Sequence, residues 1–167
     1  ATDASIGSKL INARTETLLD KPSFKNLVPM QRCIVLSDGY YEWKRSNSRA
    51  IPYYIYHPNN EILPIAGLWD FWKNNSGENI FSYTVITTQA NSDLKDIHHR
   101  MPVILDLKQI DPWLKVHNIS LANAMSFLVP FQNDLHFHQV STIVNSPSNN
   151  RIDCIRPIEN SDNLSLF

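Results

Sequence analysis

The sequence lacks the features that define several common classes of protein. No apolar run approaches 18 residues, which excludes a membrane-spanning helix within this sequence. The 2 cysteines, Cys33 and Cys154, lie far apart in apolar stretches and are expected to be buried, reduced thiols. The formal net charge is only -1, which argues against a protein that coats duplex DNA. Because no signal-peptide pattern is present, we expect a cytoplasmic protein without a membrane partner.

The sequence does contain enough apolar material for a folded domain. Of its 167 residues, 43% are hydrophobic and 19% are charged, which is typical of neither disorder nor a coiled coil. Apolar and aromatic runs, separated by short polar turns, cover residues 32–44, 51–57, 62–72, 80–88 and 136–144. Short strands joined in this way favour antiparallel pairing. The pattern predicts one α+β domain over 1–167, with a largely antiparallel, curled sheet or pseudo-barrel.

Helical patterns are fewer and shorter than the strand patterns. Helices are expected over 12–20, closed by Pro22; over 91–99, capped by Asn91 or Ser92 and ended by Pro102; and over 121–128, between Ser120 and Pro130. These segments carry several of the polar residues considered next.

The stretch "NARTET" places Asn12, Arg14 and Glu16 at alternating positions. If the stretch is extended, an amide, a guanidinium and a carboxylate share one face and could bind an anion. A surface helix start with an exposed salt bridge explains the same pattern. Spacing alone leaves both interpretations open.

Glu42 stands in the aromatic run "DGYYEW". Burial of its carboxylate would raise its pKa and suit it to general acid–base catalysis. Strand alternation could equally turn the side chain to solvent.

The doublet His98 and His99 precedes Arg100 in "HHRMP". A histidine at a helix end gains from the helix dipole when it is charged, and the arginine could hold a phosphate. A solvated helix end is the competing interpretation. The pair His136 and His138 could contribute to a zinc site, although the sequence has no HExxH motif and surface histidines explain the pair more simply.

Aromatic side chains offer a non-catalytic alternative, a module that stacks on single-stranded or modified bases. The candidates are Tyr40, Tyr41, Trp43, Trp69 and Trp72, although most of them are expected in the core.

Several motifs occur together and in order from Ile11 to Ile158: "NARTET", "RCIVLSDGYYEW", "AGLWD", "TTQAN", "HHRMPVIL" and "VSTIVNSPSNNRIDCIRPI". In this combination the chain resembles the SRAP family, the SOS-response-associated peptidases. The resemblance implies a protein of the DNA damage response that senses abasic sites in single-stranded DNA. It also implies a covalent thiazolidine crosslink through an N-terminal cysteine, with associated autopeptidase and lyase activities and no cofactor.

The resemblance assigns catalytic roles to three residues. Asn12 matches the family asparagine that orients the cysteine amine. Glu42 matches the glutamate that shuttles protons during imine formation, and His98 matches the histidine that assists opening of the sugar ring. His99 occupies the variable position of H-x-R-M-P and is expected to face solvent.

The resemblance also assigns a DNA-binding role to Arg14, Arg100 and Thr88. The two arginines would contact phosphates, and Thr88 would line the same pocket. The Met-Cys-Gly-Arg start of the family is absent, so we expect further residues upstream of Ala1 in the complete protein. Neither Cys33 nor Cys154 has the free amine that a thiazolidine requires. The expected partner is single-stranded DNA with abasic sites, bound by a monomer that associates with the nucleoid when it acts.

Overall fold

The computed structural model describes residues 10–46 and 49–158. Its strands are β1 (Asn12–Arg14), β2 (Arg32–Ser37), β3 (Gly39–Ser46), β4 (Arg49–Tyr56), β5 (Leu63–Lys73), β6 (Asn79–Gln89), β7 (Arg100–Pro102) and β8 (His136–Gln139). Its helices are α1 (Pro22–Lys25), α2 (Leu107–Leu114) and α3 (Leu121–Ser126), with 3-10 turns η2 (Thr15–Thr17), η3 (Thr142–Asn145) and η4 (Ile152–Cys154). The sequence ahead of Leu10 and part of the turn at 45–49 fall outside the described residues.

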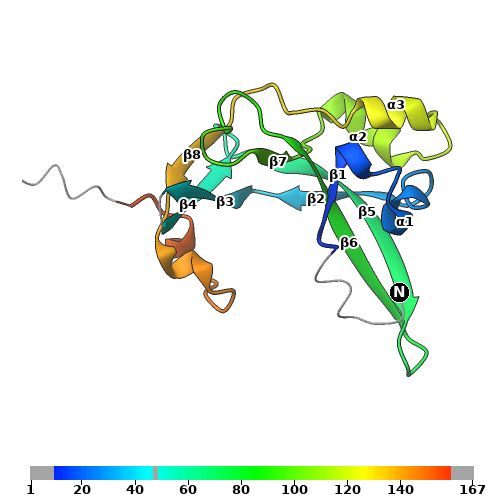
Figure 1. The fold of residues 1–167 in the computed structure, drawn as a ribbon, viewed down its shortest axis with the longest axis horizontal. Coiled ribbons are helices and arrows are strands. Elements are labelled where there is room, and N and C mark those ends of the chain that lie inside the picture. The colour runs from blue at the N-terminus through cyan, green and yellow to red at the C-terminus, as the bar shows by residue number, and fades with distance from the viewer. Residues whose placement is uncertain (1–9, 47–48, 159–167) are drawn as a thin grey trace, which may run out of the picture.

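The strands form two open sheets rather than a closed barrel within the described residues. The 5-stranded sheet has the order β1-β6-β5-β2, with β7 also paired to β6, and the 3-stranded sheet has the order β3-β4-β8. All pairs are antiparallel except β1 with β6, as the sequence predicted for most of the sheet. Figure 1 shows α1, α2 and α3 gathered beside the larger sheet, with the smaller sheet at the opposite end.

The chain passes from one sheet to the other at Asp38, between β2 and β3, which run nearly end to end (Figure 1). Gly39 is required at this crossing because a Cβ there would lie 2.5 Å from ring atoms of Tyr54. The single predicted run at 32–44 is therefore two strands that belong to different sheets.

Two apolar clusters hold the fold together. The first surrounds Trp113, which is fully buried between the larger sheet and the short helices. The second joins Ile55 of β4 and Ile65 of β5 to Leu94 and Ile97, which lie in the turn before β7. Burial of these apolar side chains anchors that turn against both sheets. Among the described residues, no helix is long and apolar enough to cross a membrane.

The predicted helix over 12–20 is wrong. Residues 12–14 form β1, residues 15–17 form a 3-10 turn, and Pro22 begins α1 instead of ending a helix. Pairing with β6 satisfies the β1 backbone and buries Ala13 completely, which overrides helix propensity. Proline suits the first turn of a helix because that turn leaves its N–H groups unpaired.

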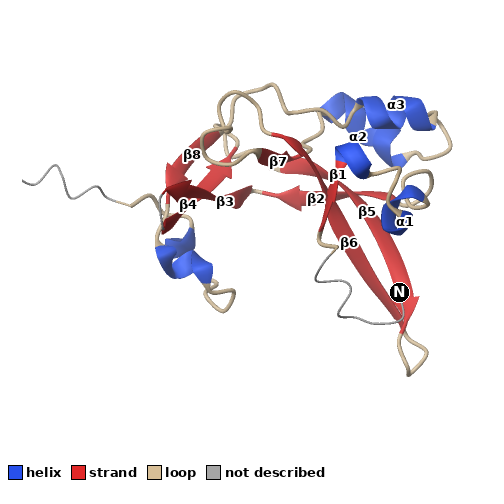
Figure 2. Cartoon of the chain, in the orientation of Figure 1, coloured by secondary structure: helices blue, strands red, loops and turns tan. Residues whose placement is uncertain are grey.

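The other helical predictions had mixed outcomes, which Figure 2 summarises. The 91–99 stretch forms consecutive turns rather than a helix, although Asn91 caps it by accepting hydrogen bonds from the N–H groups of Asp93 and Leu94. Helix α3 is capped by Ser120 as predicted. Helix α2 was not predicted, although Asp106 and Gln109 form a capping box that marks its start.

Candidate active site

Glu42 lies near the middle of β3, half-buried, with 22% of its side chain exposed. Burial raises its pKa to about 7, although a hydrogen bond with the Trp43 backbone lowers it in part. Its charge also helps to raise the pKa of the neighbouring Tyr40, after burial, which is the larger cause. Close to neutral pH, the Glu42 carboxyl can therefore both hold and release a proton.

His98 is presented to Glu42 by the capped turn that Leu94 and Ile97 anchor in the second cluster. Its Nδ1 lies 3.3 Å from Oε2 of Glu42, and its side chain is 34% exposed. The two residues are distant in sequence and come from different elements, β3 and the loop before β7. Together they form a carboxyl–imidazole pair with access to solvent, which can relay a proton.

His99 is exposed, as the sequence predicted, yet it is not remote from His98. The two rings lie 4.5 Å apart between centroids, at 52°. His98 alone contacts Glu42, so the doublet is asymmetric in its chemistry.

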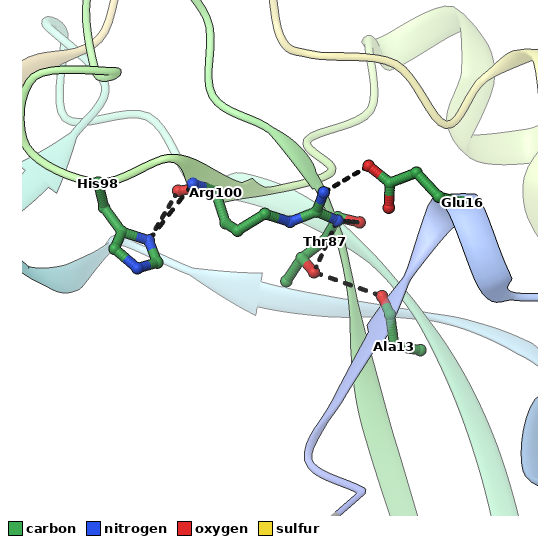
Figure 3. Close-up of polar contacts among 5 residues, drawn as sticks. All are labelled: Ala13, Glu16, Thr87, His98 and Arg100. Atoms are coloured by element: carbon green, nitrogen blue, oxygen red, sulfur yellow. Dashed lines mark hydrogen bonds and ion pairs between the residues drawn. The ribbon is translucent and has the colours of Figure 1, made fainter.

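Arg100 begins β7 and extends away from the His98 ring (Figure 3). Its guanidinium donates to the Glu16 carboxylate, to the Thr87 carbonyl at 2.6 Å and to the Thr87 hydroxyl at 3.3 Å. The hydrogen bond with Arg100 is the main cause that lowers the pKa of Glu16. The side chain of Arg100 is 11% exposed, so little of it is open to a phosphate.

Arg14 and Asn12 lie on β1 with exposed side chains, on either side of buried Ala13. Arg14 pairs in register with Thr87, the residue that also contacts Arg100. Backbone pairing thus places Arg14 beside Thr87, the residue whose carbonyl and hydroxyl contact Arg100. Within residues 10–46 and 49–158, Arg14 forms no ion pair, so its charge is available to an anion.

Thr88 is buried, with 5% of its surface exposed, and pairs with Met101 of β7. In the described part of the chain, the threonine hydroxyl that contacts Arg100 belongs to Thr87 instead. The sequence does not point to Thr87, because "TTQAN" does not reveal which of the two threonines contacts Arg100.

The geometry combines three chemical capabilities in one region. The Glu42–His98 pair can exchange protons, Arg100 and Arg14 can hold an anion, and exposed Asn12 offers an amide beside Arg14. Proton transfer next to a bound anion suits a phosphorylated or nucleic-acid substrate.

The histidines of β8 give no support to a zinc site. Nε2 of His138 lies 2.7 Å from the Ile155 carbonyl, and no group of three metal-ligating side chains forms among the described residues. Cys154 is buried as predicted, whereas Cys33 is only partly buried; both are free thiols. Burial raises the pKa of Cys33, which disfavours the reactive thiolate.

The expectation that most of the five candidate aromatics are core residues is wrong. All five are only partly buried: Tyr40, Tyr41, Trp43, Trp69 and Trp72. The tryptophan that fills the core is Trp113 instead.

Comparison with known proteins identifies relatives along nearly the whole chain. The model of the SOS response associated peptidase (SRAP) family matches residues 1–147. Abasic site processing protein YoaM of Bacillus subtilis is 41% identical over 157 residues, covering 93% of this chain and 69% of that protein. Abasic site processing protein HMCES of Gallus gallus is 38% identical over 172 residues, covering 90% of this chain but only 51% of that protein.

A solved structure shares the fold. The crystal structure of a protein from Bacteroides thetaiotaomicron superimposes with a TM-score of 0.86 at 31% sequence identity. The likeness covers 95% of this chain and 72% of that one.

Proposed function

This chain belongs to the SRAP family, and on that premise we propose that it processes abasic sites in single-stranded DNA. Its relatives YoaM and HMCES are named as abasic site processing proteins. The observation that carries the proposal is the 3.3 Å contact between Glu42 and His98. Arg100 contacts Thr87 nearby, and Arg14 pairs with Thr87 in register. The substrate offers both a phosphate backbone and a sugar whose reactivity depends on proton transfer.

The first step is opening of the abasic sugar, which is a closed hemiacetal. His98 delivers a proton to the ring oxygen while the Glu42 carboxylate accepts the proton of the anomeric hydroxyl, which leaves an aldehyde at C1′. A carboxyl group with a pKa of about 7 suits this exchange because both of its forms are populated near neutrality.

The second step joins the aldehyde to the N-terminal cysteine of the complete protein. The amine adds to C1′, and the carbinolamine hydroxyl takes the proton that Glu42 now carries and leaves as water. Loss of this water leaves an iminium ion. The thiol sulfur then adds to the same carbon while its proton passes to the Glu42 carboxylate, which leaves a neutral ring nitrogen. The products are one thiazolidine and one water molecule.

The remaining site residues bind and orient the strand. Arg14 and Arg100 hold phosphates, so a narrow charged groove is enough for a nearly neutral protein to bind DNA. Asn12 orients the cysteine amine, and Thr88 supports the pocket from its buried side.

The Glu42–His98 proton relay also suits two further reactions. One is hydrolysis of the peptide bond ahead of the cysteine, which exposes the cysteine amine. The other is β-elimination at the imine, which cleaves the DNA strand. A monomer carries every residue that these steps use, apart from the cysteine.

The test uses the protein expressed from its complete reading frame. It is incubated with a single-stranded oligonucleotide that contains one uracil, after treatment with uracil glycosylase, and resolved on a denaturing gel. We expect a heat-resistant shifted band. Matched strands that keep the uracil, or whose aldehyde has been reduced to an alcohol, lack the electrophile and should give none.

The absence of a shifted band with the intact aldehyde would overturn the proposal. Salt-sensitive binding without a covalent product would instead favour the non-catalytic strand-binding module, which the five partly exposed aromatics could serve.

A further inference from the structure

The Arg100 side chain is held at both ends of its guanidinium. Nη1 donates to the carboxylate of Glu16, while Nη2 donates to the carbonyl and hydroxyl oxygens of Thr87 (Figure 3). Thr87 is a fixed support because its own hydroxyl lies 3.5 Å from the Ala13 carbonyl, within the β1–β6 pairing. The guanidinium therefore connects β7 to β6 and, through Glu16, to the turn that follows β1.

The backbone of residue 100 sets the orientation of the His98 ring. The Arg100 N–H lies 3.4 Å from Nδ1 of His98, and the Arg100 carbonyl lies 3.3 Å from the same atom (Figure 3). A protonated Nδ1 donates to that carbonyl or to Glu42, whereas an unprotonated Nδ1 accepts from the Arg100 N–H. The position of the Arg100 backbone thus decides how Nδ1 exchanges its proton with Glu42.

Strand β7 has only 3 residues, so its pairing with β6 provides few backbone contacts. The side-chain anchor of Arg100 therefore matters for the position of this strand. Glu16 forms one of the two ends of that anchor, and its lowered pKa keeps the carboxylate ionised near neutral pH.

We propose that Glu16 is a positioning residue that holds Arg100, and through the Arg100 backbone orients the His98 imidazole for proton exchange with Glu42. This proposal rests on the proposed function of the Glu42–His98 pair. Glu16 contacts the Arg100 guanidinium, whereas the proton-exchanging pair is Glu42 and His98.

This role predicts a separation of binding from chemistry. Removal of the Glu16 charge leaves Arg100 and Arg14 with a stronger positive potential, so binding to an intact single strand should stay equal or become tighter. The covalent step should become slower because the His98 ring is no longer held in place, and small displacements of catalytic groups are costly. A residue that only stabilised the fold would lower binding and rate together.

The experiment compares Glu16→Gln with wild type in the complete protein. Fluorescence anisotropy gives the Kd for an intact single strand, and single-turnover gels at saturating protein give the rate of covalent product. We expect a Kd that is equal or lower, and a rate reduced roughly tenfold. Glu61→Gln is the matched control because Glu61 is exposed and its carboxylate accepts one hydrogen bond, from the Asn59 amide, among the described residues.

A second measurement is independent of activity. The imidazole ¹⁵N chemical shifts of His98, assigned with His98→Gln, should change in Glu16→Gln and remain unchanged in Glu61→Gln. Unchanged shifts together with a wild-type rate would overturn the positioning role while the proposed function stands. If wild type forms no covalent product, the proposed function fails, and the shifts alone decide whether Glu16 orients His98.

Discussion

Two glutamates contact opposite ends of the 98–100 segment, and their pKa values move in opposite directions. Glu42 meets the His98 ring from a half-buried strand, where burial raises its pKa to about 7. Glu16 meets the Arg100 guanidinium at a turn, with 44% of its side chain exposed, and the hydrogen bond from that guanidinium lowers its pKa. Glu42 contacts His98, whose charge depends on its protonation, whereas Glu16 contacts the permanently charged guanidinium of Arg100.

The difference separates a proton carrier from a fixed anion. A carboxyl group near its pKa can gain and lose protons during a reaction, whereas a carboxylate paired with arginine stays ionised and holds geometry. The same residue type thus serves chemistry at one end of the segment and positioning at the other. Substitutions at each end test whether the two glutamates differ in this way.

Glu42→Gln should produce the largest effect. The amide keeps the shape of the side chain but cannot carry a proton, so we expect the covalent rate to fall by about 10²–10⁴-fold. Single-turnover gels with abasic single-stranded DNA measure the rate, and circular dichroism checks that the fold is retained. A rate within threefold of wild type would show that Glu42 does not move the proton.

The stability of the protein should also depend on pH through Glu42. Its pKa is raised from 4.5 to about 7, so the folded state binds more protons than the unfolded state between these values. The contribution of Glu42 to the free energy of unfolding is therefore fully present below pH 4.5 and is lost as pH rises through 7. The loss amounts to about 2–3 kcal/mol between pH 5 and pH 8.

Urea denaturation at pH 5 and pH 8 tests this sign. The free energy of unfolding of wild type, relative to Glu42→Gln, should fall as pH rises, because the amide does not titrate. An equal pH dependence in the two proteins would mean that the folded environment does not perturb the Glu42 carboxyl.

The sequence predicted most strands but could not predict this pair of environments. Alternating apolar runs bounded by polar turns located β4, β5 and β6, because strand periodicity is a local property. The contact between Glu42 and His98 depends on how two sheets pack around the second cluster, which is a non-local property.

The family resemblance named Glu42 and His98 but not what holds them. Glu16 was noted only for its alternation with Asn12 and Arg14, and the predicted helix at 12–20 was wrong because β6 supplies backbone partners to β1. Thr87 and the Arg100 anchor follow from that pairing, so they could not be found before it was known.

The histidine doublet gives a smaller and asymmetric effect. His98→Ala removes the ring that lies 3.3 Å from Glu42, and we expect the covalent rate to fall at least tenfold. His99→Ala removes an exposed ring and should change the rate less than about twofold. Equal losses in single-turnover gels would mean that the two rings share the proton relay.

The smallest predicted effect is the pH dependence of stability through Glu16, and its sign is opposite to that of Glu42. The folded state lowers the pKa of Glu16, so the unfolded state binds more protons and stability is lost as pH falls through the folded pKa. Solvent screens this pair because Glu16 is 44% exposed, so we expect a change in the free energy of unfolding of less than about 1 kcal/mol.

Urea denaturation at pH 6 and pH 3 should show that wild type loses more stability on acidification than Glu16→Gln. Glu61→Gln should follow wild type. If Glu16→Gln also followed wild type, the Glu16 carboxylate would be no more strongly paired than an exposed one, and the contrast between the two ends of the segment would rest on Glu42 alone.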